Sequence, residues 1–166
     1  MVMHLDGEKK GLLNSLKIVN NTYVVFLKKT FMLGKIEHLG IAVKDLDKAN
    51  ETYTKLLGRK PYKQEEVASE HVMTSFFMSG ENKIELLAAT HEDSAISKYI
   101  AKRGEGIHHV AFAVENIYEE LERLKKEGFT ILNAEPKKGA DNKLIAFVHP
   151  KDSNGVLVEL CQEITE

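Results

Sequence analysis

Apolar and polar residues alternate in two similar segments of the chain. Residues 36–43 read IEHLGIAV and residues 107–114 read IHHVAFAV, and each alternation predicts a β-strand. A polar break follows each segment, and then apolar residues spaced three and four apart predict an amphipathic helix. These helical patterns end at Gly58 and Gly128, because glycine readily adopts the left-handed conformation that closes many helices. The chain therefore contains an internal repeat, in which His38 is equivalent to His109.

The ends of the two repeats match as well. Residues 83–87 (KIELL) lie over residues 157–161 (LVELC), which makes Glu85 equivalent to Glu159. Each repeat has room for two further strands between its helix and this last strand, at about 60–68 and 71–79 and at about 129–133 and 143–149. The predicted fold class is α+β, with two tandem βαβββ units forming a curved sheet cleft.

The boundaries of the units follow from the same pattern. Repeat one covers about 34–90, a linker covers 91–105, and repeat two covers about 106–163. The linker is expected to hold a helix at 93–103, capped by Asp93 or Ser94 and closed by Gly104. Residues 1–31 lack the repeat pattern and carry five lysines. We interpret them as a leader before a domain at 32–166, and this leader is either disordered or an over-extended start. The alternative is a short helix or strand docked on that domain.

Composition excludes several classes of protein. The chain has 166 residues, 23 basic against 25 acidic side chains, and a formal net charge of -2, so no basic excess favours nucleic acid or an anionic membrane. No apolar run approaches the roughly 20 residues of a spanning helix, and residues 23–27 are too short for a signal-peptide core. We therefore expect a cytoplasmic protein. A single cysteine, Cys161, excludes an internal disulfide framework.

Two histidines and two glutamates stand at repeat-equivalent positions. His38, Glu85, His109 and Glu159 are expected to reach equivalent depths in the cleft, where two imidazoles and two carboxylates suit a divalent metal ion. Cobalt, manganese, nickel and zinc all fit this ligand type. A lone histidine in an apolar strand is more often a hydrogen-bonded core residue, and a solvated edge face would explain either glutamate alone. The repeat, however, places all four at equivalent positions, and a buried carboxylate needs a partner. His108 is expected to face away from the cleft, and His149 is a candidate for contact with a substrate or for a simple turn.

These residues resemble the vicinal oxygen chelate superfamily, which includes glyoxalases, bleomycin resistance proteins and dioxygenases. Within it, GEGIHHVA at 104–111 and the segments AFVHP at 146–150 and NGVLVEL at 154–160 are most similar to the methylmalonyl-CoA epimerases. The resemblance covers about 33–163. It implies a metal bound by His38, His109 and Glu159, with Glu85 at a position where some members carry glutamine. It also implies an acyl-CoA substrate and a homodimer.

The implied reaction interconverts (R)- and (S)-methylmalonyl-CoA by removal and return of the α-proton through a metal-stabilised enolate. Glu159 is expected to be the general base, and the acid on the other face is Glu85, Glu70 or a relayed water. Some members carry a glutamate as second acid/base where this chain has Thr74. The lysines Lys137, Lys138 and Lys143 are candidates for contact with coenzyme A phosphates.

Three other functions are compatible with the sequence. A glyoxalase I-type lactoylglutathione lyase would use the same four ligands, and a dioxygenase would require redox-active iron. A non-catalytic small-molecule binding protein of this fold is the alternative of another class, but such proteins commonly lose the metal ligands.

Overall fold

The chain divides into two units, Met1–Phe31 and Met32–Glu166. The computed structural model describes residues 13–19, 22–27 and 33–165. In the first unit, β1 (Leu13–Val19) and β2 (Thr22–Leu27) pair as an antiparallel hairpin. The leader expected at 1–31 stays a prediction, and its residues 1–12, 20–21 and 28–31 lie outside the described part of the chain.

The second unit repeats the predicted order of elements. The first repeat comprises β3 (Ile36–Ala42), α1 (Leu46–Leu57), β4 (Lys63–Val67), β5 (Val72–Ser79) and β6 (Asn82–Ala89). The linker helix is α2 (Ala95–Arg103), with Ser94 as its N-cap and Gly104 as its C-cap, as predicted. The second repeat comprises β7 (Gly106–Ala113), α3 (Ile117–Lys126), β8 (Lys137–Lys138), β9 (Lys143–Val148) and β10 (Leu157–Glu163). The βαβββ order is therefore confirmed in both repeats.

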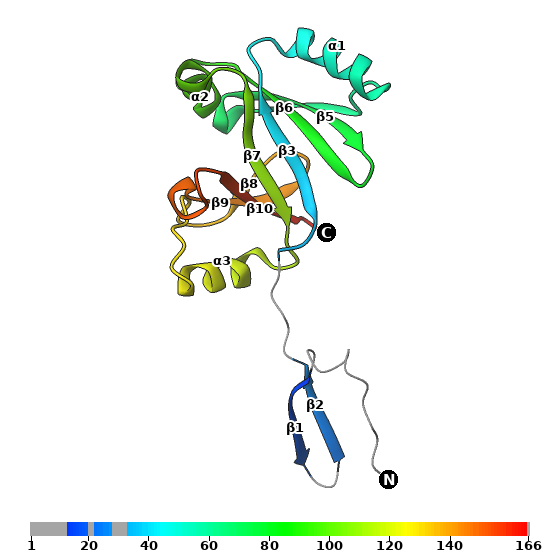
Figure 1. Ribbon diagram of the computed structural model, residues 1–166, viewed down its shortest axis with the longest axis vertical. Helices are drawn as coiled ribbons and strands as arrows, with labels where there is room; N and C mark the ends of the chain where they lie inside the picture. The colour runs from blue at the N-terminus through cyan, green and yellow to red at the C-terminus, as the bar shows by residue number, and fades with distance from the viewer. Residues whose placement is uncertain (1–12, 20–21, 28–32, 166) are drawn as a thin grey trace. The chain divides into compact units, whose positions relative to one another are not determined.

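All eight strands of this unit form one curled sheet. Its strand order is β4-β5-β6-β3-β7-β10-β9-β8 (Figure 1). The two repeats join edge to edge through the antiparallel pair β3 and β7, while β3 pairs parallel with β6 and β7 pairs parallel with β10. This symmetric arrangement places the four strands that carry the predicted ligands side by side at the centre of the sheet.

Apolar helix faces cover the sheet. In α1, Tyr53 and Leu57 pack against Phe77 and Leu86. In α3, the repeat-equivalent helix, Ile117, Leu121 and Leu124 pack against Ala146, Val148 and Leu160. The linker helix α2 inserts the buried Ile96 between Ala42, Val72 and Leu87.

The strand predicted at 129–133 is wrong. Only Ile131 makes a β-bridge, to Val148, and the short strand β8 forms six residues later instead. Backbone bonds to β9 form only around this bridge, from the Leu132 N–H to the Phe147 carbonyl and from the His149 N–H to the Thr130 carbonyl. The strand does not extend further because side chains accept the neighbouring N–H groups. The Phe147 N–H donates to the Asn133 side-chain oxygen at 3.1 Å, and the Thr130 N–H donates to the Asp152 carboxylate at 2.7 Å.

Polar side chains join the two edges of the curled sheet. The Tyr62 hydroxyl donates to Asp141 at 3.1 Å, the Asp141 N–H donates to Glu65 at 3.0 Å, and Glu70 pairs with Lys137. Glu65 lies on edge strand β4, and Asp141 lies in the turn between β8 and β9. The curled sheet and α2 thereby surround a cavity of about 290 Å³.

Candidate metal centre

Each of the four central strands contributes one of the predicted ligands to the cavity. Glu85 comes from β6, His38 from β3, His109 from β7 and Glu159 from β10, and all four line the cavity. Their side chains are buried, with only 3 to 6% of each residue exposed. The structure therefore brings together all four residues that the repeat had singled out.

The donor atoms of these side chains converge on one point. The two histidine Nε2 atoms are 2.9 Å apart. The Glu85 Oε2 atom lies 3.3 Å from Nε2 of His38 and 3.4 Å from Nε2 of His109. The Glu159 Oε2 atom lies 3.9 Å and 3.3 Å from the same two nitrogens.

This spacing fits a shared cation. Nitrogen and oxygen ligands lie about 2.1 Å from a bound zinc ion, so two ligands of one ion are separated by about 3 to 3.5 Å. Two buried carboxylates also need a positive charge, because an uncompensated buried carboxylate is costly. The donor set and its geometry therefore suit a divalent metal ion.

The residue before each of the two central histidines, His38 and His109, is also turned toward the cavity, which alternation did not predict. The β3–β7 register shifts between Ile36 and His38, and again where Gly40 pairs with His109 but Ile41 pairs with Ile107. Each shift is a β-bulge, which inserts one extra residue and re-aims its side chain. The extra residues are Glu37 and His108, and both line the cavity.

The expectation that His108 faces away from the cleft is therefore wrong. Its Nδ1 atom lies 3.0 Å from Nδ1 of His109, and its ring packs edge-on against Tyr99. Burial lowers the pKa of His108 to about 4, so its imidazole is neutral at pH 7.

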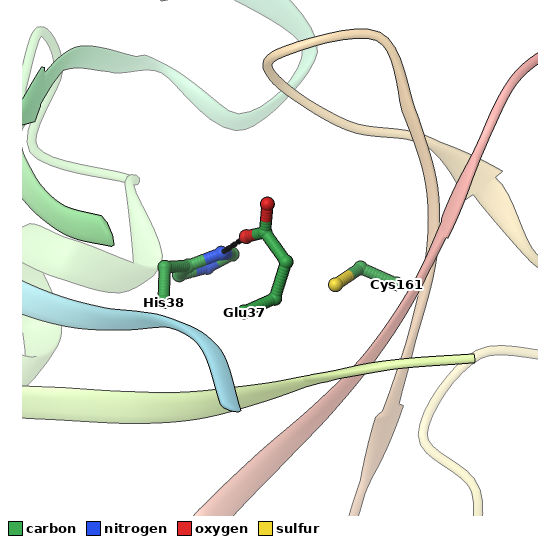
Figure 2. Close-up of side chains that lie close together, drawn as sticks. All are labelled: Glu37, His38 and Cys161. Atoms are coloured by element: carbon green, nitrogen blue, oxygen red, sulfur yellow. Dashed lines mark hydrogen bonds and ion pairs between the residues drawn. The ribbon is translucent and has the colours of Figure 1, made fainter. Parts of the chain in front are cut away.

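Glu37 is a functional candidate that sequence reasoning missed. Its Oε2 atom lies 2.5 Å from Nδ1 of His38 (Figure 2). Its Oε1 atom lies 2.6 Å from the Lys83 ammonium. Burial opposes ionisation of Glu37, but the bonds to His38 and Lys83 outweigh it and lower the pKa to about 2. The signal available in the sequence was an acidic residue directly before His38, in a strand whose other residues are apolar.

Figure 2 also shows Cys161 beside Glu37 and His38. The ligand atoms of these three residues lie within 4.8 Å of one another. However, the His38–Glu37 hydrogen bond and the Lys83 ammonium already occupy the Glu37 carboxylate. Burial raises the pKa of the Cys161 thiol, which lies 3.4 Å from the Phe112 carbonyl oxygen. We therefore do not assign a second metal to this cluster.

The two carboxylates of the centre differ in their electrostatics. Burial opposes ionisation of Glu85, but hydrogen bonds with His109 and His38 outweigh it and lower its pKa to about 2. Burial dominates at Glu159 and raises its pKa. Burial also opposes the charged form of His38, yet the bonds with Glu37 and Glu85 raise its pKa to about 10. Environments that push apart the pKa values of two neighbouring carboxylates are typical of acid–base sites.

The remaining candidates for acid–base catalysis or substrate contact do not contribute to the four-residue cluster. Thr74 is buried in the cavity wall, where its hydroxyl donates to the Glu65 carbonyl at 3.0 Å. Glu70 lines the cavity from the short 3-10 helix Ala68–Glu70. His149 is the N-cap of the 3-10 helix Pro150–Asp152, its Nδ1 accepting the Lys151 N–H at 3.0 Å, so the turn interpretation holds.

The three candidate lysines differ as well. Lys143 is 7% exposed and pairs with Glu37 and Glu163, which makes it a poor contact for a phosphate outside the cavity. Lys137 lines the cavity and pairs with Glu70, while Lys138 is exposed.

No helix among the described residues is long and apolar enough to span a membrane.

A family model for the glyoxalase/bleomycin resistance protein/dioxygenase superfamily matches residues 37–147. The chain belongs to this superfamily. The match includes His38, Glu85 and His109, and the tandem βαβββ arrangement is the fold of this superfamily.

Relatives within the superfamily carry an activity in their names. The chain is 40% identical to the ethylmalonyl-CoA/methylmalonyl-CoA epimerase of Cereibacter sphaeroides over 133 residues, which is 79% of this chain and 99% of the relative. The structure of methylmalonyl-CoA epimerase from Mycobacterium tuberculosis superposes with a TM-score of 0.78 at 32% identity, covering 84% of this chain and 94% of that one. A variant of the Streptomyces coelicolor methylmalonyl-CoA epimerase, in complex with 2-nitronate-propionyl-CoA, superposes with a TM-score of 0.76 at 34% identity, covering 81% and 100% of the chains.

Proposed function

We propose that this protein is a divalent-metal-dependent epimerase that interconverts (R)- and (S)-methylmalonyl-CoA. The observation that carries the proposal is the convergence of two imidazole nitrogens, 2.9 Å apart, and two buried carboxylates on one point of the cavity. Cobalt, manganese, nickel and zinc remain the candidate ions, since all accept nitrogen and carboxylate ligands. The named epimerases similar to this chain support the substrate.

The size and lining of the cavity support an acyl-CoA bound by its acyl end. A volume of about 290 Å³ lies at the lower limit of small-molecule sites, which span roughly 300 to 1,000 Å³. Methylmalonyl is small enough for such a space, whereas the nucleotide of coenzyme A must lie outside. Apolar side chains, including Leu87, Phe147 and Leu157, line the cavity and suit the methyl group of the substrate.

The chemistry requires removal of a proton from a carbon between a thioester and a carboxylate. The ion held by His38, Glu85, His109 and Glu159 would supply a Lewis acid that polarises the thioester carbonyl. Glu159 takes the α-proton on a carboxylate oxygen, because burial raises its pKa and makes it the more basic of the two carboxylates. The surrounding apolar wall excludes water from the enolate.

Inversion requires a proton donor on the opposite face of the substrate. Thr74 does not fill this role, because its hydroxyl donates to the Glu65 carbonyl. Glu85 contacts both histidines at the proposed metal position and is held there. Glu70 lines the cavity without contacting the four ligands, and Lys137 pairs with it. We therefore assign the return of the proton to Glu70, whose carboxylate relays a proton from the paired Lys137 ammonium to the carbon.

A lactoylglutathione lyase would use the same centre, so the metal ligands do not separate the two activities. Assays of both substrates on the metal-loaded protein distinguish them. We expect turnover of methylmalonyl-CoA and none of the glutathione hemithioacetal.

The decisive experiment is solvent deuterium incorporation at the α-carbon of methylmalonyl-CoA, with and without added cobalt. We expect rapid exchange that depends on the ion. His109→Ala should abolish exchange while circular dichroism shows retained folding. Exchange that persists in folded His109→Ala would refute the proposed centre.

A further inference from the structure

The two β-bulges stand at equivalent positions of the two repeats. Glu37 precedes His38 and His108 precedes His109, and the same offset of 71 residues relates both pairs. Without a bulge, the period of two along a strand would point each preceding residue to the other side of the sheet. The fold instead places an imidazole or a carboxylate directly beside each proposed ligand.

In the first repeat, the neighbour is a carboxylate held from both sides. Its Oε2 atom lies 2.5 Å from Nδ1 of His38, and its Oε1 atom lies 2.6 Å from the Lys83 ammonium. The Lys83 ammonium in turn pairs with Asp141 of the second repeat at 2.6 Å. An ionised carboxylate only accepts hydrogen bonds, so Nδ1 of His38 carries a proton. Binding of an ion requires an unprotonated Nε2, which leaves His38 as the Nδ1–H tautomer with its Nε2 lone pair directed at the cavity.

In the second repeat, the neighbour is another histidine. Nδ1 of His108 lies 3.0 Å from Nδ1 of His109, so one of the two nitrogens donates and the other accepts. If Nε2 of His109 is to bind an ion, its lone pair must face the centre and its proton must sit on Nδ1. Nδ1 of His108 is then the acceptor, and the neutral His108 ring carries its own proton on Nε2.

We propose that Glu37 and His108 are positioning residues that hold His38 and His109 in the Nδ1–H tautomer with both Nε2 atoms directed at the metal. This inference rests on the proposed metal centre and adds the groups that orient it. The partner of the second nitrogen of a ligating histidine fixes both its tautomer and its ring orientation. Here a negatively charged acceptor serves one ligand and a neutral acceptor serves the other.

Metal affinity tests the inference without reference to turnover. Titration of the apoprotein with cobalt is expected to show about 10- to 100-fold weaker binding for Glu37→Leu and for His108→Leu, since loss of such partners typically has this effect. His108→Asn keeps an acceptor near the Nδ1 position and should bind within a few-fold of wild type. His108→Gln moves the acceptor to the Nε2 position and should bind about tenfold more weakly than His108→Asn.

The matched controls are Glu66→Gln and His71→Asn, which change exposed side chains that do not line the cavity. Both should keep the wild-type affinity. If either leucine variant fails to fold, the comparison of His108→Asn with His108→Gln and of Glu37→Gln with wild type still decides. Equal affinity throughout these folded variants overturns the inference.

The tautomers themselves are measurable in the zinc-loaded protein. Long-range ¹H–¹⁵N correlation spectra should show protonated Nδ1 atoms for His38 and His109 and a protonated Nε2 atom for His108. A proton on Nδ1 of His108 would overturn the assignment. If wild-type protein binds neither cobalt nor zinc, the proposed metal centre itself is wrong. If wild-type protein binds these ions but the variants bind equally well, only the role of the two positioning residues is wrong.

Discussion

Replacement of Gly40 by alanine is expected to disable the metal centre without unfolding the domain. Gly40 is buried on β3 and pairs with His109 across the β3–β7 junction. An ideal Cβ atom on Gly40 would lie only 2.1 Å from Cε1 and 2.5 Å from Nε2 of the His109 ring. The His109 imidazole therefore lies directly over the position where every other amino acid has a side chain.

The size of the effect follows from these distances. Carbon atoms in contact prefer a separation of about 3.5 Å, so the ring must retreat by about 1.4 Å to accept the new methyl group. Metal–ligand distances tolerate about 0.2 Å, and a misplacement of about 1 Å can reduce activity about 100-fold. We therefore expect Gly40→Ala to lower kcat/KM at least about 100-fold, with a matching loss of cobalt affinity. Overpacking should lower the free energy of unfolding by only about 1 to 3 kcal/mol.

Gly80→Ala is the matched control for this experiment. Gly80 lies in the turn between β5 and β6 at φ 64°, where a Cβ meets no atom within 4 Å. Alanine there costs about 1 kcal/mol of backbone strain. Urea denaturation, cobalt titration and the epimerase assay should show destabilisation alone in Gly80→Ala. Wild-type affinity and turnover in Gly40→Ala would refute the role assigned to this close contact.

Four further outcomes are expected. Removal of metal with a chelator should stop α-proton exchange and lower Tm, since a ligand bound to the native state stabilises it, and cobalt should restore both; an unchanged Tm and exchange rate would contradict a metal centre. Glu159→Gln should slow epimerisation by about 100-fold or more, measured by coupled assay, and activity near wild type would exclude Glu159 as the base. Glu70→Gln should lose inversion but still exchange the α-proton of one epimer, as NMR in deuterium oxide would show; unimpaired inversion would exclude Glu70. Cys161, 2% exposed with a pKa raised by burial, should resist thiol reagents until the protein is unfolded, and rapid labelling of native protein would contradict its burial.

The convergence of the four candidate ligands was predictable because the sequence repeats. One histidine or one glutamate in an apolar strand carries little information, but His38 and His109, with Glu85 and Glu159, recur at matching places in two similar units. A repeat that folds twice in the same way places equivalent residues at equivalent depths. In the structure the two Nε2 atoms lie 2.9 Å apart, and each carboxylate has an oxygen 3.3 to 3.9 Å from both of them.

The neighbours of those ligands were not predictable from alternation. The rule that successive side chains point to opposite faces assumes an unbroken strand, and both β3 and β7 contain a bulge. A bulge depends on how a partner strand pairs, which local sequence does not specify. The prediction for His108 failed for this reason, and Glu37 was overlooked for the same reason.

The sequence by itself determined the βαβββ repeat, the linker helix and the four side chains proposed to bind metal. These depend on periodicity, on helix caps and on duplication, all of which act over short stretches of chain. Only the tertiary structure decided that the repeats join through β3 and β7, that Tyr62 and Glu65 meet Asp141 across the sheet edges, and that Glu37 and His108 face the cavity. Those features arise from pairing between residues far apart in the sequence, where strand register and side-chain bonds, rather than local propensity, determine which way each residue points.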